Sequence, residues 1–110
     1  MALELTLHCI TAFWTNGPNW PNNGEIDILE GVNNYTNNQA TIHTNVGCSI
    51  STSNSTLLGV TGTVVGGTDC SAAQSNNAGC GMRSPSTTSF GSGFNSVGGG
   101  VYASKWVVHA

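Results

Sequence analysis

The sequence predicts an all-β protein of short antiparallel strands joined by long polar loops. Gly, Ser, Thr and Asn make up about half of the 110 residues, and these residue types favour turns. Apolar residues are nevertheless 38% of the chain and include three Trp, which disordered segments lack. Two runs with the pattern of a strand, residues 24–31 and 40–46, flank a turn-rich stretch, as the arms of an antiparallel hairpin do. A chain of this length is enough for one modest domain.

Residues 24–31, Gly-Glu-Ile-Asp-Ile-Leu-Glu-Gly, form the clearest predicted strand. The chain has five carboxylate side chains, and three of them, Glu25, Asp27 and Glu30, lie in this run. Successive side chains of a strand point to opposite faces, so Glu25 and Asp27 share one face while Ile26 and Ile28 point to a core on the other. Glu30 has the wrong parity. It joins the other two acids only if a β-bulge near Ile28-Leu29 absorbs one residue.

The spacing of the acids indicates a reaction as well as a strand. Two glutamates that lean toward each other across Asp27 can bring their carboxyl groups to about 5 to 5.5 Å, the separation of a retaining glycosidase. Clusters of carboxylates in general mark functional sites. A solvated acidic strand face and a calcium site are the alternatives that the spacing leaves open.

The run from Glu25 to Glu30 resembles the E-x-D-x-x-E signature of glycoside hydrolase family 16, in the bulged form of its laminarinase-like members. The flanking segments extend the resemblance toward secreted fungal endo-β-glucanases: Ala12-Phe13-Trp14, residues 17–23, Gly31-Val32-Asn33 and Ile42-His43-Thr44. The resemblance implies part of a β-jelly-roll sandwich that is incomplete in this chain. It divides the chain into a divergent N-terminal segment (1–11), a partial catalytic domain (12–106) and a divergent C-terminal end (107–110).

The resemblance also implies a function and a mechanism. The expected reaction is retaining endo-hydrolysis of β-1,3- or mixed β-1,3/1,4-glucan, with Glu25 as nucleophile, Glu30 as acid/base and Asp27 as the group that orients Glu25. This chemistry needs no metal and no other cofactor. Two alternatives remain: a catalytically inactive fragment or β-sandwich carbohydrate-binding module, and a cell-wall transglycosylase of the same family.

Three further residues are candidates for substrate binding. Trp14 and Trp20 fit either a core role or an apolar platform for a sugar ring, and the platform role suits Trp20 better because it lies in a polar loop. His43 has the opposite parity to Ile42 in the predicted strand at 40–46, so it should face the acids. The family resemblance implies that this histidine contacts the substrate.

The remainder of the chain is predicted to consist mainly of loops. Residues 47–81 contain only a weak strand at 57–65. Residues 82–100 alone fit a linker, but the family resemblance implies an internal loop there, followed by strands at 101–103 and from Trp106. Four cysteines, Cys9, Cys48, Cys70 and Cys80, lack the spacing of a zinc site, so disulfides are expected, with three pairings open.

Charge and targeting signals restrict the partners. Two cations and a net charge of −3 exclude a nucleic-acid or anionic-membrane partner, because almost nothing would neutralise phosphate. A neutral β-glucan fits better, and the whole domain is expected to be a monomer. Residues 1–14 show no secretory signal, and no apolar run approaches about 18 residues. The composition, the sequons at Asn34 and Asn54 and the resemblance nevertheless predict a secreted glycoprotein.

Overall fold

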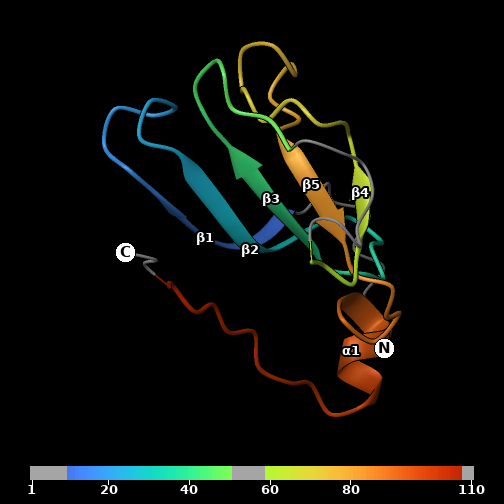
Figure 1. Cartoon of the computed structure of the whole chain (residues 1–110). Coiled ribbons are helices and arrows are strands. Elements are labelled where there is room, and N and C mark those ends of the chain that lie inside the picture. Colours follow the sequence, from blue (N-terminus) through green and yellow to red (C-terminus); the bar gives the residue numbers. More distant parts are fainter. Residues whose placement is uncertain (1–9, 51–58, 108–110) are drawn as a thin grey trace.

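The computed structural model describes residues 10–50 and 59–107, which form one antiparallel sheet and a short helix (Figure 1). The strands are β1 (Ile10–Asn16), β2 (Glu25–Val32), β3 (Gln39–His43), β4 (Thr63–Val65) and β5 (Cys80–Arg83), and the helix is α1 (Gly91–Ser96). Their order in the sheet is β1-β2-β3-β5-β4. In the described part of the chain, no helix has the length and apolar character needed to cross a membrane.

The central hairpin follows the prediction. β2 covers the predicted strand, and β3 pairs with it in antiparallel orientation. β3 ends at His43 instead of residue 46 because the chain then turns to a different partner. The Thr44 N–H donates to the Cys70 carbonyl, and the Thr44 carbonyl accepts from the Ala72 N–H, so the backbone of Thr44 is no longer available to β2.

The predicted β-bulge is present in β2. Opposite β3, the partners of Asp27 and Glu30 are Thr41 and Gln39, which are only two residues apart. Opposite β1, Ile28 has no partner at all. One extra residue is therefore absorbed between Asp27 and Glu30, which corrects the parity of Glu30 and places the three acids on one face.

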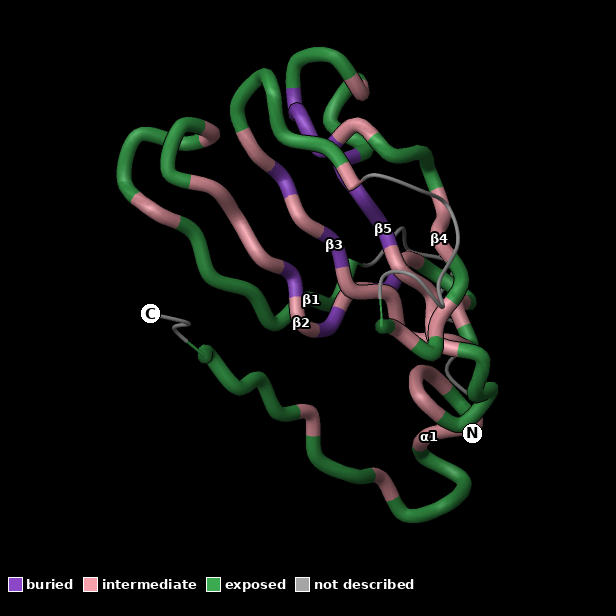
Figure 2. Tube along the Cα trace, viewed as in Figure 1, coloured by how far each residue is buried: buried purple, intermediate pink, exposed green. Residues whose placement is uncertain are grey.

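Burial is distributed differently from the expected pattern (Figure 2). The most buried strand residues include Asp27, Thr41 and His43 on the acidic face, at 3%, 1% and 7% exposure. The isoleucines of β2 and β3, predicted to enter a core on the other face, are only half-buried, and Phe13 is 52% exposed. A core on that face is therefore present only around Leu29, which is 9% exposed beside Phe90, and the described residues leave the isoleucines partly uncovered.

A second buried centre lies at the end of β5. Cys70 and Cys80 form a disulfide, and both are buried together with Ser71 and Ala72. This bridge closes the shortest of the loops that the sequence allowed. Cys48 is exposed and has no disulfide partner in the described ranges, while Cys9 lies outside them.

The C-terminal part of the chain departs most from the prediction. The strand expected at 101–103 is wrong: residues 100–107 have no regular structure, and Val101 is 91% exposed. A strand needs a neighbour to pair its backbone groups, and this segment pairs with none of the described strands. The strand expected from Trp106 lies outside the described residues beyond 107. β5 and α1 lie in stretches predicted as loops. The weak strand at 57–65 is confirmed only over β4, and its first two residues lie outside the described ranges, as does Asn54.

Candidate active site

The acidic face of the sheet is organised in rows. Residues directly opposite each other in antiparallel strands project to the same face. Three such rows cross β1, β2 and β3: Asn16, Glu25 and His43; Trp14, Asp27 and Thr41; Ala12, Glu30 and Gln39. The structure thus brings together five of the six residues that the sequence singled out, and the register of the strands alone fixes their common face.

Asp27 occupies the most secluded position of the three acids. Its Oδ2 atom lies 3.4 Å from His43 Nε2. Burial first, and then the negative charges of Glu25 and Glu30 and a hydrogen bond with Glu25, raise the pKa of Asp27 to about 7. Asp27 is therefore largely neutral below neutral pH. In that form it can donate a hydrogen bond to an ionised Glu25, which accepts it.

Glu30 is held by a chain of side-chain hydrogen bonds that starts on β5. Arg83 Nη2 donates to Gln39 Oε1 at 2.8 Å, Gln39 Nε2 donates to Thr41 Oγ1 at 3.1 Å, and Thr41 Oγ1 donates to Glu30 Oε2 at 2.7 Å. Thr41 is almost fully buried, so its hydroxyl has little freedom to turn elsewhere. The two glutamates therefore have different neighbours: a carboxyl group for Glu25 and a hydroxyl group for Glu30.

Asn38 holds the bulge itself. Its Oδ1 atom accepts from the Glu30 N–H at 3.1 Å, and its Nδ2 atom donates to the Ile28 carbonyl at 3.0 Å. The Glu30 N–H and the Ile28 carbonyl are backbone groups at the bulge, where the hydrogen bonds between β2 and β3 are interrupted. Asn38 supplies the partners that β3 does not. The sequence places Asn38 only in a turn region between two strands, and the nearby bulge was the one signal that could have identified its role.

The two candidate tryptophans occupy different places. Trp14 lies in the row of Asp27 on β1, with 48% of its surface exposed beside the acids. Trp20 lies in the connection between β1 and β2, beyond the Asn16–Glu25 pair, and is 44% exposed. Trp14 is thus part of the acidic face, and Trp20 lies past its end.

His43 is positioned by a glycine that sequence reasoning missed. Gly79 has a φ of +62°, and a Cβ atom added there would lie 2.9 Å from His43 Nδ1 and 2.6 Å from the Ile42 carbonyl. Any other residue would therefore be strained and would collide with β3. The close approach fixes the Nδ1 edge of the ring against the chain before β5 and leaves Nε2 toward Asp27.

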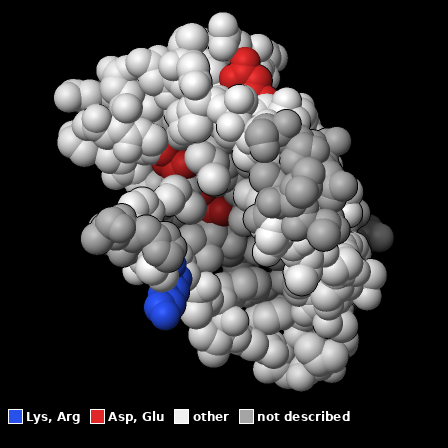
Figure 3. All heavy atoms as spheres, in the orientation of Figure 1, with Lys and Arg blue, Asp and Glu red and all other residues white. Residues whose placement is uncertain are grey.

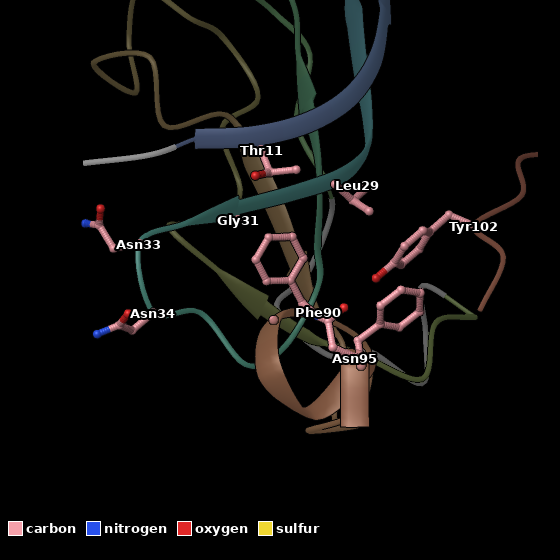
Figure 4. Close-up of a pocket in the computed structure, with 10 residues that line it drawn as sticks. Thr11, Leu29, Gly31, Asn33, Asn34, Phe90, Asn95 and Tyr102 are labelled. Carbon is pink, nitrogen blue, oxygen red and sulfur yellow. The ribbon is translucent and has the colours of Figure 1, made fainter. Parts of the chain in front are cut away.

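A cavity of about 450 Å³ lies on the opposite side of the sheet from the acids. Figure 4 shows Phe90 and Tyr102 on one side of it, with Leu29 and Gly31 of β2 on the other. These β2 residues flank Glu30 in sequence and therefore point away from it. A Cβ atom at Gly31 would overlap the end of the Phe90 ring, so the glycine lets this ring lie against β2. This cavity is a feature of the apolar face, separate from the acidic site.

The surface around the elements carries little charge. Most of the face shown in Figure 3 is neutral, with small acidic and basic areas, as expected from two cations and five acids in the sequence. Such a surface suits a neutral hydroxyl-rich ligand better than a polyanion.

Comparison with known proteins identifies the family. The family model of XgeA-like catalytic domains of glycoside hydrolase family 16 matches residues 8–110. A probable glycosidase of Schizosaccharomyces pombe is 50% identical over 97 residues, which is 86% of this chain and 22% of that protein. An endo-1,3(4)-β-glucanase of Emericella nidulans is 41% identical over 95 residues, or 86% of this chain and 14% of that protein.

Solved structures share the fold. Laminarinase 16A of Phanerochaete chrysosporium, with β-glucans in donor and acceptor sites, is 37% identical with a TM-score of 0.71, over 83% of this chain and 29% of that one. An elongating family 16 β-1,3-glucosyltransferase is 41% identical with a TM-score of 0.72, over 91% of this chain and 31% of that one. The chain thus spans less than a third of these structures and less than a quarter of the curated relatives above. The predicted fold, part of a jelly-roll sandwich of antiparallel strands, is confirmed. The predicted family is confirmed as well: the chain belongs to glycoside hydrolase family 16.

Proposed function

We propose that the protein containing this chain cleaves β-1,3- or mixed β-1,3/1,4-glucan internally, with retention of the anomeric configuration. The observation that carries the proposal is the bulge in β2, which gives Glu25, Asp27 and Glu30 a common face. The names of the relatives support the substrate class, since they include endo-1,3(4)-β-glucanases and a laminarinase bound to β-glucans.

The proposed reaction has two steps with inverted roles for Glu30. In the first, the Glu25 carboxylate forms a bond to the anomeric carbon while the glycosidic bond breaks, and Glu30 gives its proton to the leaving oxygen. In the second, Glu30 takes a proton from water as that water attacks the anomeric carbon, and the bond to Glu25 breaks. Both glutamates return to their initial states.

The neighbours of the two glutamates support this division of work. A neutral Asp27 can donate to the ionised nucleophile and orient it, as its raised pKa favours. The Thr41 hydroxyl fixes one oxygen of Glu30, which leaves the other oxygen for the proton that the reaction transfers. Asp27 and Thr41 are directly opposite each other in β2 and β3. A single row of the sheet therefore positions both glutamates, Glu25 through Asp27 and Glu30 through Thr41.

Substrate contacts are assigned to the rest of the acidic face. The exposed ring of Trp14 provides an apolar platform for a sugar beside Asp27, and His43 contacts a hydroxyl near Glu25. Trp20 would bind a more distant sugar at the end of the face. The Cys70–Cys80 disulfide supports an oxidising compartment and so a secreted protein.

A glucosyltransferase is the second candidate. The family 16 β-1,3-glucosyltransferase is 41% identical to this chain, about as similar as the hydrolase of Emericella nidulans. The two reactions share the first step and differ in the second, where a sugar hydroxyl replaces water as acceptor. Products longer than the supplied oligosaccharide would indicate transfer, and free reducing ends without longer products would indicate hydrolysis.

The test compares Glu25→Gln and Glu30→Gln with Asp69→Asn, a carboxylate change outside the acidic face. Release of reducing sugar from laminarin should fall by at least about 100-fold in both glutamine variants and persist in the Asp69 variant. NMR of the first product should show the β-anomer. Unchanged release in either glutamine variant would contradict the assignment. Glucan binding by the native chain without any release would favour a binding module.

A further inference from the structure

We infer that Glu25, Asp27 and His43 form a binding site for a divalent transition metal, of which zinc fits the ligand set best. One carboxylate oxygen from each acid and one ring nitrogen of the histidine lie within 4.8 Å of one another. The three residues come from two adjacent strands whose register is fixed, with Glu25 directly opposite His43. The cluster is thus built into the sheet and does not depend on a loop.

A second observation is independent of this clustering. Asp27 is almost completely buried, with 3% of its surface exposed. Its Oδ2 atom has no hydrogen-bond partner in the described structure. Buried polar atoms are normally paired. The same oxygen lies 3.4 Å from His43 Nε2, an ion-pair contact without a hydrogen bond, so it faces the histidine nitrogen of the cluster.

The separation of Asp27 and His43 agrees with a tetrahedral ion, and Glu25 lies within 4.8 Å of both. Zinc binds histidine nitrogen and carboxylate oxygen at about 2.0 to 2.2 Å, and a tetrahedral angle then separates two ligand atoms by about 3.4 Å. The Asp27–His43 separation already has this value. Glu25 is half-buried, so its side chain has room to turn toward the same ion. Three protein ligands leave a fourth position open for water.

The ligand types select the metal. Imidazole nitrogen suits zinc and its neighbours in the transition series, whereas calcium takes six to eight oxygens and magnesium keeps several waters. A site with one nitrogen, two carboxylates and one open position therefore favours zinc over calcium.

One consequence rests on the proposed function. An ion at this site would occupy the nucleophile Glu25 and its partner Asp27, so zinc and glucan would compete for the same face. Zinc would then be a reversible inhibitor of sugar release, and a chelator would restore the activity.

The test measures zinc binding without glucan. Zinc is titrated by calorimetry into the whole chain with Cys9 and Cys48 replaced by serine, at about pH 8 so that the ligands are deprotonated. One ion should bind per chain. His43→Ala and Glu25→Gln should each weaken binding by at least about 100-fold. Glu30→Gln, which removes an acid of the same face outside the cluster, should leave the affinity within a few fold.

Three results would overturn the inference. Equal zinc affinity in the native chain and His43→Ala would place the ion elsewhere, and calcium binding as tight as zinc binding would indicate oxygen ligands alone. If the variants do not fold, cobalt in the serine-substituted chain decides: intense visible bands of a four- or five-coordinate ion support the site, and weak octahedral bands contradict it. Zinc binding by a chain that releases no sugar would leave this inference standing and count against the proposed function instead.

Discussion

At the scale of single residues, Asp27 is the most buried of the described acids. It is buried between two other acids, and each of these influences favours its neutral form. A site that must keep one glutamate ionised and another protonated benefits from a neighbour that can give a hydrogen bond instead of adding charge. The neutral carboxyl of Asp27 meets this need because it lies between Glu25 and Glu30 in the strand.

The raised pKa of Asp27 predicts how stability depends on pH. Between the ordinary value of 3.8 and about 7, the folded chain binds more protons at Asp27 than the unfolded chain does, so this contribution to stability falls as pH rises through that window. The full penalty is present above about pH 7. Asp27→Asn removes the charge and keeps the shape, so it should raise the free energy of unfolding at about pH 8 by a few kcal/mol.

Urea unfolding of both proteins at about pH 8 and about pH 4 checks this prediction. The advantage of Asp27→Asn should shrink at the lower pH, where the native carboxyl is neutral as well. An advantage of equal size at both pH values would show that the charge of Asp27 is not its cause, and a loss at pH 8 would contradict the raised pKa.

At the scale of elements, the bulge in β2 gives the sheet its acidic site, and Asn38 gives the bulge its partners. The amide side chain is the only common type that donates and accepts in one fixed plane, as the Ile28 carbonyl and the Glu30 N–H require. Asn38 is in turn tied to the segment before α1, since its backbone N–H donates to Ser89 Oγ at 2.9 Å. The placement of Glu30 therefore depends on residues far away in sequence.

Replacing Asn38 should show whether the bulge positions Glu30 for the reaction without affecting how glucan binds. Asn38→Ala leaves both bulge groups unpaired, so it should lower the free energy of unfolding by about 1 to 3 kcal/mol and reduce kcat on glucan with little change in KM. Asn37→Ala is the matched control. It loses a hydrogen bond to the Ser84 carbonyl, away from the bulge, and should lower stability without lowering kcat. Equal losses of kcat in both variants would refute a specific role for Asn38.

The elements also show what the sequence could predict. β2 and its bulge were predictable because charged residues are scarce and the parity of Glu30 is wrong without an extra residue. The partners of Asn38 were not, because they exist only once the bulge has formed. β5 was missed because it is four residues long and contains Gly81, and it is stabilised by pairing with β3 and β4, which outweighs local propensity.

The other differences between prediction and structure also arise because contacts between distant segments cannot be read from local sequence. α1 contains two glycines in six residues, which disfavour a helix locally, so no sequence signal indicated it. The strand at 101–103 was expected from the family resemblance, but the residues there have no described neighbour with which to pair. In the candidate site, the alternation of side chains along a strand was enough to predict that the acids and His43 share a face. The Thr41 contact with Glu30 did not, because it depends on the register between β2 and β3.

At the scale of the whole molecule, the sheet has two unlike faces, and its most buried strand side chains include three on the acidic face. The acidic face holds buried polar residues, while the apolar face carries half-buried isoleucines, Phe13 and an open hollow of about 450 Å³. A second hollow of about 380 Å³ is lined by residues of both faces, among them Glu25 and Ile26. Trp106 lines the second hollow and is 76% exposed, so the C-terminal segment contacts the sheet only loosely there. The radius of gyration is 15.0 Å, above the roughly 13 Å of a compact chain of this length. The chain also covers less than a third of its structural relatives.

This asymmetry predicts how the 110-residue chain behaves alone. An open apolar sheet face favours association, so light scattering should show a mass that rises with concentration, and Phe13→Thr should lower that mass. Trp14→Thr is the matched control, because Trp14 is the next residue of β1, has nearly the same exposure, 48% against 52%, and lies on the acidic face. An equal effect of both substitutions would assign the association to exposed aromatic surface in general. A monomer at every concentration would show that the apolar face does not drive association, whereas association that Phe13→Thr alone reduces would identify this face as the surface through which copies associate.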